Sequence, residues 1–223
     1  MQKDIVRITS IEKLTHNVLK IVVEKPYLFN FIPGQATEIA INKSGWELEK
    51  RPFTFTCLPS DPYLEFSIKT YPEHKGVTNE LLQLKVMDEL ILHEVFGTIN
   101  YQGEGTFIAG GAGVTPFISI LRSLRSENKI GNNKLLFANK TKADIILEDE
   151  FNEMLGQNFI NILSDEQTKE YASGQINEAF LKANIEDTGK KIYLCGPEPM
   201  MDAIEKQLGN IGVNATLIVK EAF

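Results

Sequence analysis

The sequence has little cysteine, no long apolar run and no excess of positive charge. Its 223 residues include only 2 cysteines, Cys57 and Cys195, which are too few and too far apart to form a zinc or iron–sulfur cluster. This scarcity fits a reduced, intracellular setting. The 30 acidic residues outnumber the 23 basic ones and give a net charge of -7, which disfavours nucleic acid and anionic membranes as partners.

Other familiar kinds of site are also missing. No apolar segment approaches the ~20 residues of a membrane span, and the first residues lack the layout of a signal peptide. His16, His74 and His93 show no metal-binding spacing, and the sequence contains no G-x-S-x-G motif. We therefore expect a cytoplasmic protein without a metal site, and we expect it to be a monomer.

The first hundred residues predict an antiparallel β-barrel. Short segments rich in β-branched and aromatic residues alternate with period two and are separated by Pro, Gly, Asn or Asp. The expected strands are residues 17–23, 37–41, 51–57, 64–70 and 89–92. One short helix is expected after Gly76, with a hydroxyl cap from Thr78.

After Gly97 the pattern changes to apolar strands that alternate with amphipathic helices. The expected strands are 106–109, 134–138, 159–163, 191–194 and 214–219, and the expected helices are 116–125, 148–155, 175–183 and 199–208. Such alternation is typical of a parallel sheet with helices on both faces. The sequence thus predicts two domains, a barrel over residues 1–100 and an α/β domain with a five-stranded parallel sheet over residues 101–223.

The strongest local motif is Gly110–Phe117 (GGAGVTPF), which follows an expected strand and opens an expected helix. Gly111 and Gly113 allow the backbone to approach a pyrophosphate closely. Thr115 offers a hydroxyl group, and Pro116 suits the first turn of a helix. The motif therefore predicts a dinucleotide site, although a tight turn without a ligand has the same pattern.

Two further motifs carry residues suited to cofactor binding. Cys195 begins the sequence CGPEPM at the end of the fourth expected parallel strand, the edge of a sheet at which nucleotides bind. Arg51 begins the sequence RPFT, in which alternation places Phe53 and Thr54 on opposite sides of a strand. Taken alone, Cys195 is typical of a small buried hydrophobe and Arg51 of an exposed edge strand.

Together these motifs resemble those of the ferredoxin–NADP reductase superfamily, in the family's order and along essentially the whole chain. The resemblance implies a Greek-key FAD-binding barrel followed by an NAD(P)-binding domain. It implies that Arg51 holds the flavin pyrophosphate, that Phe53 lies against the isoalloxazine, and that Thr54 bonds near flavin N5. The full set of flavin contacts implied by the resemblance is Arg51, Pro52, Phe53, Thr54, Ile68, Lys69, Tyr71, Gly76, Val77 and Thr78.

In the second half, the resemblance implies nicotinamide-nucleotide contacts along the two loops. These are Gly111, Gly113, Thr115, Pro116, Cys195, Gly196, Pro197 and Met200. The end of the chain is similar to the family's terminal E-x-[YF], so Glu221 is a polar candidate and Phe223 a lid over the flavin, unless Phe223 is an ordinary terminus. The resemblance makes Thr54, Cys195 and Glu221 the candidate catalytic residues.

The chain departs from the family pattern at Met87 and over residues 94–97, neither of which belongs to a cofactor motif. Another departure concerns the nucleotide. Ser164 and Asp165 follow the third expected strand, where NADPH-using members of the family often carry Ser-Arg. The carboxylates of Asp165 and Glu166 would repel a 2′-phosphate and could accept from ribose hydroxyls, so NADH is favoured over NADPH, although Lys140 or Lys142 could still serve a phosphate.

The resulting hypothesis is a flavoprotein oxidoreductase with FAD and NADH or NADPH as cofactors. A hydride would pass from nicotinamide C4 to flavin N5, and electrons would leave to a separate acceptor such as a ferredoxin, a flavodoxin, a haem protein or free flavin. The negative net charge makes a strongly acidic ferredoxin the less natural partner. Two alternatives stay open: an NAD(P)H:flavin reductase with free flavin as substrate, and a non-catalytic module that binds flavin or nucleotide and regulates a partner.

Overall fold

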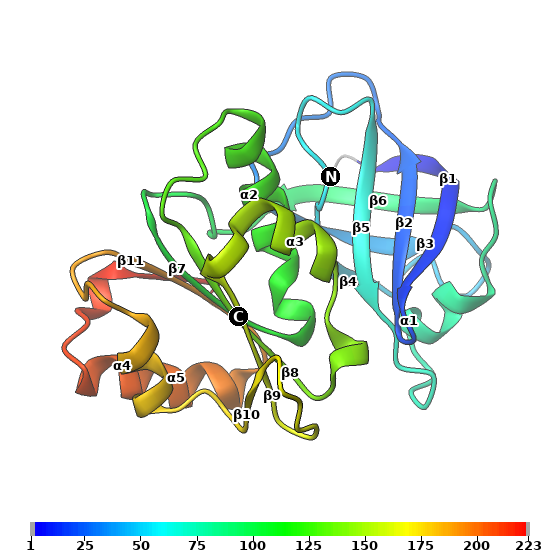
Figure 1. The fold of residues 1–223 in the computed structure, drawn as a ribbon. Helices are drawn as coiled ribbons and strands as arrows, with labels where there is room; N and C mark the ends of the chain where they lie inside the picture. Colours follow the sequence, from blue (N-terminus) through cyan, green and yellow to red (C-terminus); the bar gives the residue numbers. More distant parts are fainter. Residues whose placement is uncertain (1–2, 222–223) are drawn as a thin grey trace. The chain divides into compact units, whose positions relative to one another are not determined.

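The structure is a computed structural model that describes residues 3–221. It contains two six-stranded sheets, and its contacts divide the chain into two compact units. The barrel unit comprises the residues up to Gly97 together with Thr115–Ser123. The α/β unit comprises Thr98–Val114 and the residues from Leu124 onward (Figure 1).

The first sheet is antiparallel, with the strand order β4-β3-β6-β1-β2-β5. The strands are β1 (Asp4–Thr15), β2 (Val18–Glu24), β3 (Ala36–Ile41), β4 (Arg51–Thr54), β5 (Tyr63–Lys69) and β6 (Glu89–Phe96). An antiparallel bridge between Phe55 and Phe66 joins the end of β4 to β5, so the sheet closes on itself. The barrel predicted from the period-two pattern is therefore confirmed.

Inward-facing side chains of successive strands form the barrel core. Ile21 and Val23 of β2, Phe66 of β5 and Leu90 of β6 are all fully buried. The ring of Phe55 packs beside Phe66 with a centroid distance of 5.2 Å. Burial of such apolar surface is the main source of stability for a unit of this kind.

The details of the barrel differ from the sequence prediction at three places. The pattern did not predict β1, although this strand has 12 residues. The strand expected over 51–57 ends as a regular strand at Thr54. The predicted hydroxyl cap is wrong, because the N-cap of α1 (Val77–Glu80) is Gly76, and Thr78 lies inside the helix. A 3-10 turn, Leu81–Gln83, follows α1 directly.

The second sheet is parallel, with the strand order β10-β9-β8-β7-β11-β12. Its strands are β7 (Gly105–Gly110), β8 (Lys134–Asn139), β9 (Phe159–Leu163), β10 (Ala172–Ser173), β11 (Lys191–Cys195) and β12 (Ile218–Lys220). The helices are α2 (Thr115–Ser126), α3 (Glu148–Leu155), α4 (Glu178–Asn184) and α5 (Glu198–Asn210). The predicted parallel sheet is confirmed, but it has six strands where five were expected, because the two-residue strand β10 pairs with β9 at the edge.

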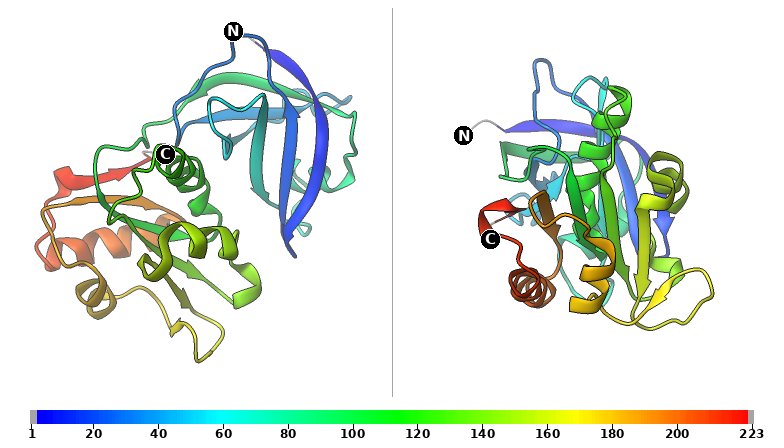
Figure 2. Two further views of the ribbon diagram at one scale, coloured as in Figure 1. Left: turned by 45° about the horizontal axis from the view of Figure 1, so that its top comes forward. Right: turned by 60° about the vertical axis from the view of Figure 1, so that its left-hand side comes forward.

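Helices cover both faces of this sheet, as the alternation of side chains on β8 shows. Leu136 packs on one face with Leu181 of α4 and Ile204 of α5. Phe137 points to the other face, where its ring lies near that of Phe151 of α3, at a centroid distance of 6.4 Å. The ribbon views show α4 and α5 on one side of the sheet and α3 on the other (Figure 2). Over residues 3–221, no helix has the length and apolar character needed to span a bilayer.

Candidate cofactor-binding site

In the barrel unit, the predicted flavin residues of β4 lie beside those at the end of β5. The bridge between Phe55 and Phe66 is antiparallel, and β4 and β5 contact one another. The same register places Phe53 across from Ile68. Pro52 is exposed, Lys69 is half-buried and Ile68 is buried. Two segments that are separate in the sequence thus form one surface of the barrel unit.

Arg51 opens β4 with an exposed guanidinium group. Its Nη1 donates to the backbone oxygen of Lys50 at 2.6 Å, and its Nη2 lies 3.8 Å from a carboxylate oxygen of Glu49. Phe53 and Thr54 are half-buried, and the Phe53 ring packs against the barrel core. A cation, a planar ring and a hydroxyl on one short strand match the phosphate, ring and polar edge of a flavin dinucleotide.

The segment after β5 adds an exposed ring and free space. Tyr71 is 45% exposed, and its ring stacks on His74 at a centroid distance of 5.7 Å. Gly76 is extended, with φ at -132°, and a Cβ atom there would meet no atom within 4 Å. Val77 is buried and Thr78 is half-buried. The residues of the barrel unit therefore fit FAD, since room for a ligand adjoins a flat aromatic surface.

A buried polar network holds the first turns of α2 in the barrel unit. Arg122 Nη1 donates to Glu65 Oε1 at 2.6 Å and to the backbone oxygen of Thr56 at 2.8 Å. The Ser119 hydroxyl donates to the backbone oxygen of Cys57 at 2.9 Å. Thr56 and Cys57 come two and three residues after Thr54, the last predicted flavin residue of β4, so the network fixes the chain shortly after it leaves β4. Sequence reasoning missed it, because no local pattern marks Arg122 and Glu65 as partners.

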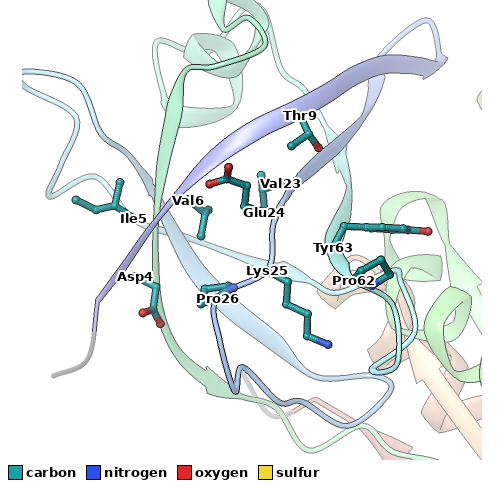
Figure 3. Close-up of a pocket in the computed structure, with 10 residues that line it drawn as sticks. All are labelled: Asp4, Ile5, Val6, Thr9, Val23, Glu24, Lys25, Pro26, Pro62 and Tyr63. Atoms are coloured by element: carbon teal, nitrogen blue, oxygen red, sulfur yellow. The ribbon is translucent and has the colours of Figure 1, made fainter.

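A pocket of about 480 Å³ lies elsewhere in the barrel unit. Its lining includes Glu24 at the end of β2 and Tyr63 at the start of β5, together with Lys25 (Figure 3). The predicted flavin residues Ile68 and Lys69 lie at the opposite end of β5. The pocket is therefore separate from the predicted flavin surface.

In the α/β unit, β7 runs into a 3-10 turn, Gly111–Val114, which leads into α2. Gly111 has a φ of 51°, in the left-handed region that favours glycine. A Cβ atom on Gly113 would lie 2.3 Å from the backbone oxygen of Cys195, so only glycine fits there. Thr115 and Pro116 open α2, where they are buried, and their contacts assign them to the barrel unit.

The glycine loop is pressed against the segment that follows β11. A Cβ atom on Gly110 would lie 2.3 Å from the sulfur of Met200 and 3.1 Å from Cδ of Pro197. A Cβ atom on Gly196 would lie 3.2 Å from the backbone nitrogen of Gly110. The structure thus brings together the predicted residues of both loops. A glycine-rich turn next to the start of a helix fits the phosphates of a dinucleotide.

Cys195 ends β11 and is partly buried. Burial, and next the Glu221 carboxylate, raise the pKa of its thiol to about 12, so the group is neutral at neutral pH. Glu221 Oε1 accepts from the backbone nitrogen of Thr98 at 3.1 Å. Phe223 lies outside the described residues. Thr54 and Cys195 belong to different units, and the catalytic roles that the resemblance implies for them stay a prediction.

Ser164 and Asp165 lie alongside the end of β8. The backbone nitrogen of Ser164 donates to the backbone oxygen of Asn139 at 3.0 Å, and that of Asp165 donates to the backbone oxygen of Lys140 at 2.9 Å. The Ser164 hydroxyl also donates to Asp165 Oδ1 at 2.6 Å. These residues therefore occupy the carboxyl edge of the parallel sheet, as the glycine loop does. Carboxylate oxygens at this edge fit the hydroxyls of a ribose.

Two family models match adjacent parts of the chain, an FAD-binding domain over residues 4–109 and an oxidoreductase NAD-binding domain over residues 107–206. The chain belongs to the ferredoxin–NADP reductase superfamily. The order of its two domains is the order that the sequence motifs implied. The descriptions of the two models support FAD and a nicotinamide nucleotide as cofactors.

Curated relatives include subunits of oxygenase systems. The chain is 28% identical over 217 residues to a glycine betaine monooxygenase reductase subunit of Chromohalobacter salexigens, covering 91% of this chain and 58% of the relative. It is 29% identical over 218 residues to the reductase component of propane 2-monooxygenase of Rhodococcus jostii, covering 88% of this chain and 57% of the relative. The chain thus spans little more than half the length of these relatives.

Solved structures agree on the fold. The FAD/NAD-binding domain of a nitric oxide dioxygenase from Vibrio cholerae superposes with a TM-score of 0.87 at 24% identity, covering 98% of each chain. A ferredoxin NADP+ reductase from Neisseria gonorrhoeae, with bound FAD and NADP, superposes with a TM-score of 0.85 at 15% identity, covering 99% of this chain and 98% of that one. At these identities the likeness shows the fold alone.

Proposed function

We propose that the chain is the catalytic part of a reductase, which moves a hydride from NAD(P)H to bound FAD and passes the electrons to a separate acceptor. The observation that carries the proposal is the adjacency of an FAD-binding and an NAD-binding domain in one chain. Bound FAD supplies the redox chemistry, since it accepts a hydride and releases electrons. The protein supplies binding, orientation and electrostatics.

In the barrel domain, proposed over residues 1–100, side chains bind the flavin. Arg51 holds the pyrophosphate, because its guanidinium group is exposed and has only Glu49 at 3.8 Å as a charged neighbour in the described part of the chain. Phe53 and Tyr71 offer planar faces to the flavin. The Thr54 hydroxyl donates a hydrogen bond near flavin N5. The remaining proposed contacts are Pro52, Ile68, Lys69, Gly76, Val77 and Thr78.

In the α/β domain, proposed over residues 101–223, the nicotinamide nucleotide lies along the glycine loop. The turn Gly111–Val114 and the start of α2, with Thr115 and Pro116, hold the phosphates. Cys195 lies beside the nicotinamide as a neutral thiol, since its raised pKa, about 12, keeps the proton on sulfur. Glu221 is the polar partner near this thiol. Gly196, Pro197 and Met200 complete the proposed nucleotide contacts, and Phe223 is proposed as the lid over the flavin.

We propose NADH as the physiological donor. The support is the carboxylate of Asp165 at the carboxyl edge of the sheet, where a ribose hydroxyl would donate to it and a 2′-phosphate would be repelled. The acceptor is proposed to be an oxygenase component or an electron carrier such as a ferredoxin or flavodoxin. The names of the relatives, which are reductase parts of monooxygenases, support this class.

The test is an anaerobic absorbance titration of the full chain reconstituted with FAD, first with NADH and separately with NADPH. We expect NADH to bleach the flavin bands faster than NADPH does. Thr54→Val should slow this reduction by roughly tenfold while FAD stays bound, because one hydrogen bond made during hydride transfer is lost. Thr9→Val, which removes an exposed hydroxyl of β1, is the matched control and should leave the rate unchanged.

Each alternative function has its own outcome in this experiment. A colourless protein that binds no added FAD would contradict the proposed flavin site. FAD that binds but is bleached by neither nucleotide would instead support a regulatory module. Release of FAD after each turnover, with loose binding throughout, would support a flavin reductase that treats FAD as a substrate.

A further inference from the structure

The segment after β9 folds back onto Lys142. Glu170 Oε2 accepts from Lys142 Nζ at 2.7 Å, and Glu166 Oε2 accepts from the backbone nitrogen of Lys142 at 2.7 Å. Lys142 Nζ also lies 5.4 Å from the ring centroid of Tyr171. Tyr171 in turn donates its hydroxyl to Glu148. The ammonium group of Lys142 is thus already engaged by one carboxylate and one aromatic ring.

This cluster lies at the edge of the sheet that the nucleotide must use. Lys142 comes shortly after the end of β8, and Glu166 shortly after the end of β9. Both strands are parallel to β7, which leads into the glycine loop, and ligands of such sheets bind beyond the carboxyl ends of the strands. The cluster and the turn Gly111–Val114 belong to the same compact unit.

Charge decides which nucleotide this edge accepts. A 2′-phosphate carries about two negative charges, and its binding requires Lys or Arg side chains that are not already paired with a carboxylate. The ammonium group of Lys142 forms an ion pair with the carboxylate of Glu170. Asp165 and Glu166 add further negative charge at the same edge. A ribose 2′-hydroxyl has no charge and can donate to a carboxylate. Because Glu170 pairs with Lys142, the arrangement disfavours a phosphate more than the carboxylates of Asp165 and Glu166 would do alone.

We propose that Glu166 and Glu170 are specificity-determining residues, which engage Lys142 and so exclude nucleotides that carry a 2′-phosphate. The inference rests on the proposed function, because it assumes that the glycine loop binds a nicotinamide nucleotide. It makes Lys142 a latent phosphate ligand, whose ammonium group is held by Glu170 and whose backbone nitrogen is held by Glu166. NADH is then accepted because its ribose presents hydroxyls alone.

The test compares two probes that differ only in the 2′-phosphate, 5′-AMP and adenosine 2′,5′-bisphosphate. Calorimetry on the FAD-loaded full chain gives the ratio of their dissociation constants. The double variant E166Q/E170Q keeps the shape of both residues and an oxygen acceptor on each. It should shift the ratio towards the bisphosphate by about fivefold, since the exposed Lys142–Glu170 pair is worth at most ~1 kcal/mol. Adding K142M to this variant should remove the gain.

The matched control is E178Q/E186Q, which makes the same change in net charge in the same unit, at residues paired with Lys182 and Lys134. This control should leave the ratio unchanged. An unchanged ratio in E166Q/E170Q would overturn the inference, as would an equal shift in the control. Failure of 5′-AMP to bind any variant would instead contradict the proposed nucleotide site and remove the basis of the inference with it.

Discussion

The proposed cofactor contacts of the barrel unit and of the α/β unit differ in how closely they are packed. In the barrel unit the proposed contacts are side chains with space around them: Arg51 is exposed, Tyr71 is 45% exposed, and a Cβ atom on Gly76 would meet nothing within 4 Å. In the α/β unit the proposed contact is backbone, and a Cβ atom on Gly113 would lie 2.3 Å from the chain opposite. The first site should therefore tolerate substitution structurally, whereas the second should not.

The largest effect is expected from the polar network of Arg122 and Glu65, which lies close to the proposed flavin contacts of the barrel unit. Arg122→Met leaves Glu65 buried without its cation, and should lower the free energy of unfolding by about 3 kcal/mol. Arg125→Met is the control on the same helix, because its ion pair with Glu153 is exposed and should contribute about 0.5 kcal/mol or less. Urea unfolding followed by the fluorescence of Trp46, which packs on the barrel core, measures the loss in the barrel unit, and far-ultraviolet circular dichroism follows the unfolding of both units. Equal losses in the two variants would show that the buried network does not support the barrel.

A pair of glycine substitutions tests the contrast most directly. Gly113→Ala forces a carbon atom against the backbone of Cys195, and should cost about 2–3 kcal/mol because backbone on both sides must move. Gly76→Ala meets open space at an extended φ of -132°, and should change stability by less than about 0.5 kcal/mol. Thermal unfolding of both variants gives the comparison. If alanine were tolerated equally at the two positions, the glycine loop would not be closely packed.

A substitution in the barrel unit that weakens FAD binding without lowering stability would support the contrast between the two units. Arg51→Ala should weaken FAD binding by about tenfold, since a charge-assisted hydrogen bond to phosphate is removed. Its effect on the stability of the FAD-free protein should be within about 0.5 kcal/mol, because the side chain is exposed. Arg7→Ala on β1, where the pair with Glu89 is also exposed, is the control. Titration of the FAD-free protein with FAD, followed by flavin fluorescence, measures the affinity; equal weakening in both variants would exclude a specific role for Arg51.

Elements with strong apolar periodicity could be predicted from the sequence alone. Phe159–Leu163 and Glu148–Leu155 match their predicted bounds, because each is short, continuous and apolar on at least one face. The strand β1 could not be found in this way, since Val6 and Ile8 are its only buried apolar residues and its length comes from pairing with two partners, β6 and β2. The strand expected over 214–219 begins only at Ile218, because the side chain of Asn214 accepts from the backbone nitrogen of Thr216 and caps a 3-10 turn.

In the candidate site, too, the features that could be predicted are those carried by a continuous segment of the sequence. Motifs that are contiguous in the sequence, such as the segment Arg51–Thr54 and the glycine loop, could be recognised from their residues and spacing. Contacts between distant residues could not be, and they include both the Arg122–Glu65 pair and the engagement of Lys142 by Glu170. Sequence alone left Lys142 open as a phosphate ligand, and only the fold of the segment after β9 shows that a carboxylate already holds it.

The smallest expected effect concerns a titratable group in the barrel wall. His93 on β6 is 6% exposed, and within the described residues neither of its ring nitrogens has a hydrogen-bond partner. Burial lowers the pKa of His93 from 6.5, and the nearby charges of Lys50 and Lys3 lower it further, against an opposing effect of Glu38. The unfolded chain therefore binds a proton at a higher pH than the folded one. The stability due to neutral His93 is complete above about pH 6.5 and is lost as the pH falls towards its folded pKa.

His93→Phe keeps a buried ring at this position and removes the titration. The slope of unfolding free energy against pH between about 7 and 5 should be shallower in the variant than in the unaltered chain. Because Trp46 packs on the same barrel core, its fluorescence during urea unfolding at each pH reports on the unit concerned. The effect should also be confined to this unit, so hydrogen exchange in the parallel sheet should show the same pH dependence in both proteins. Identical slopes by Trp46 fluorescence would mean that His93 takes up its proton in the folded barrel as readily as in the unfolded chain.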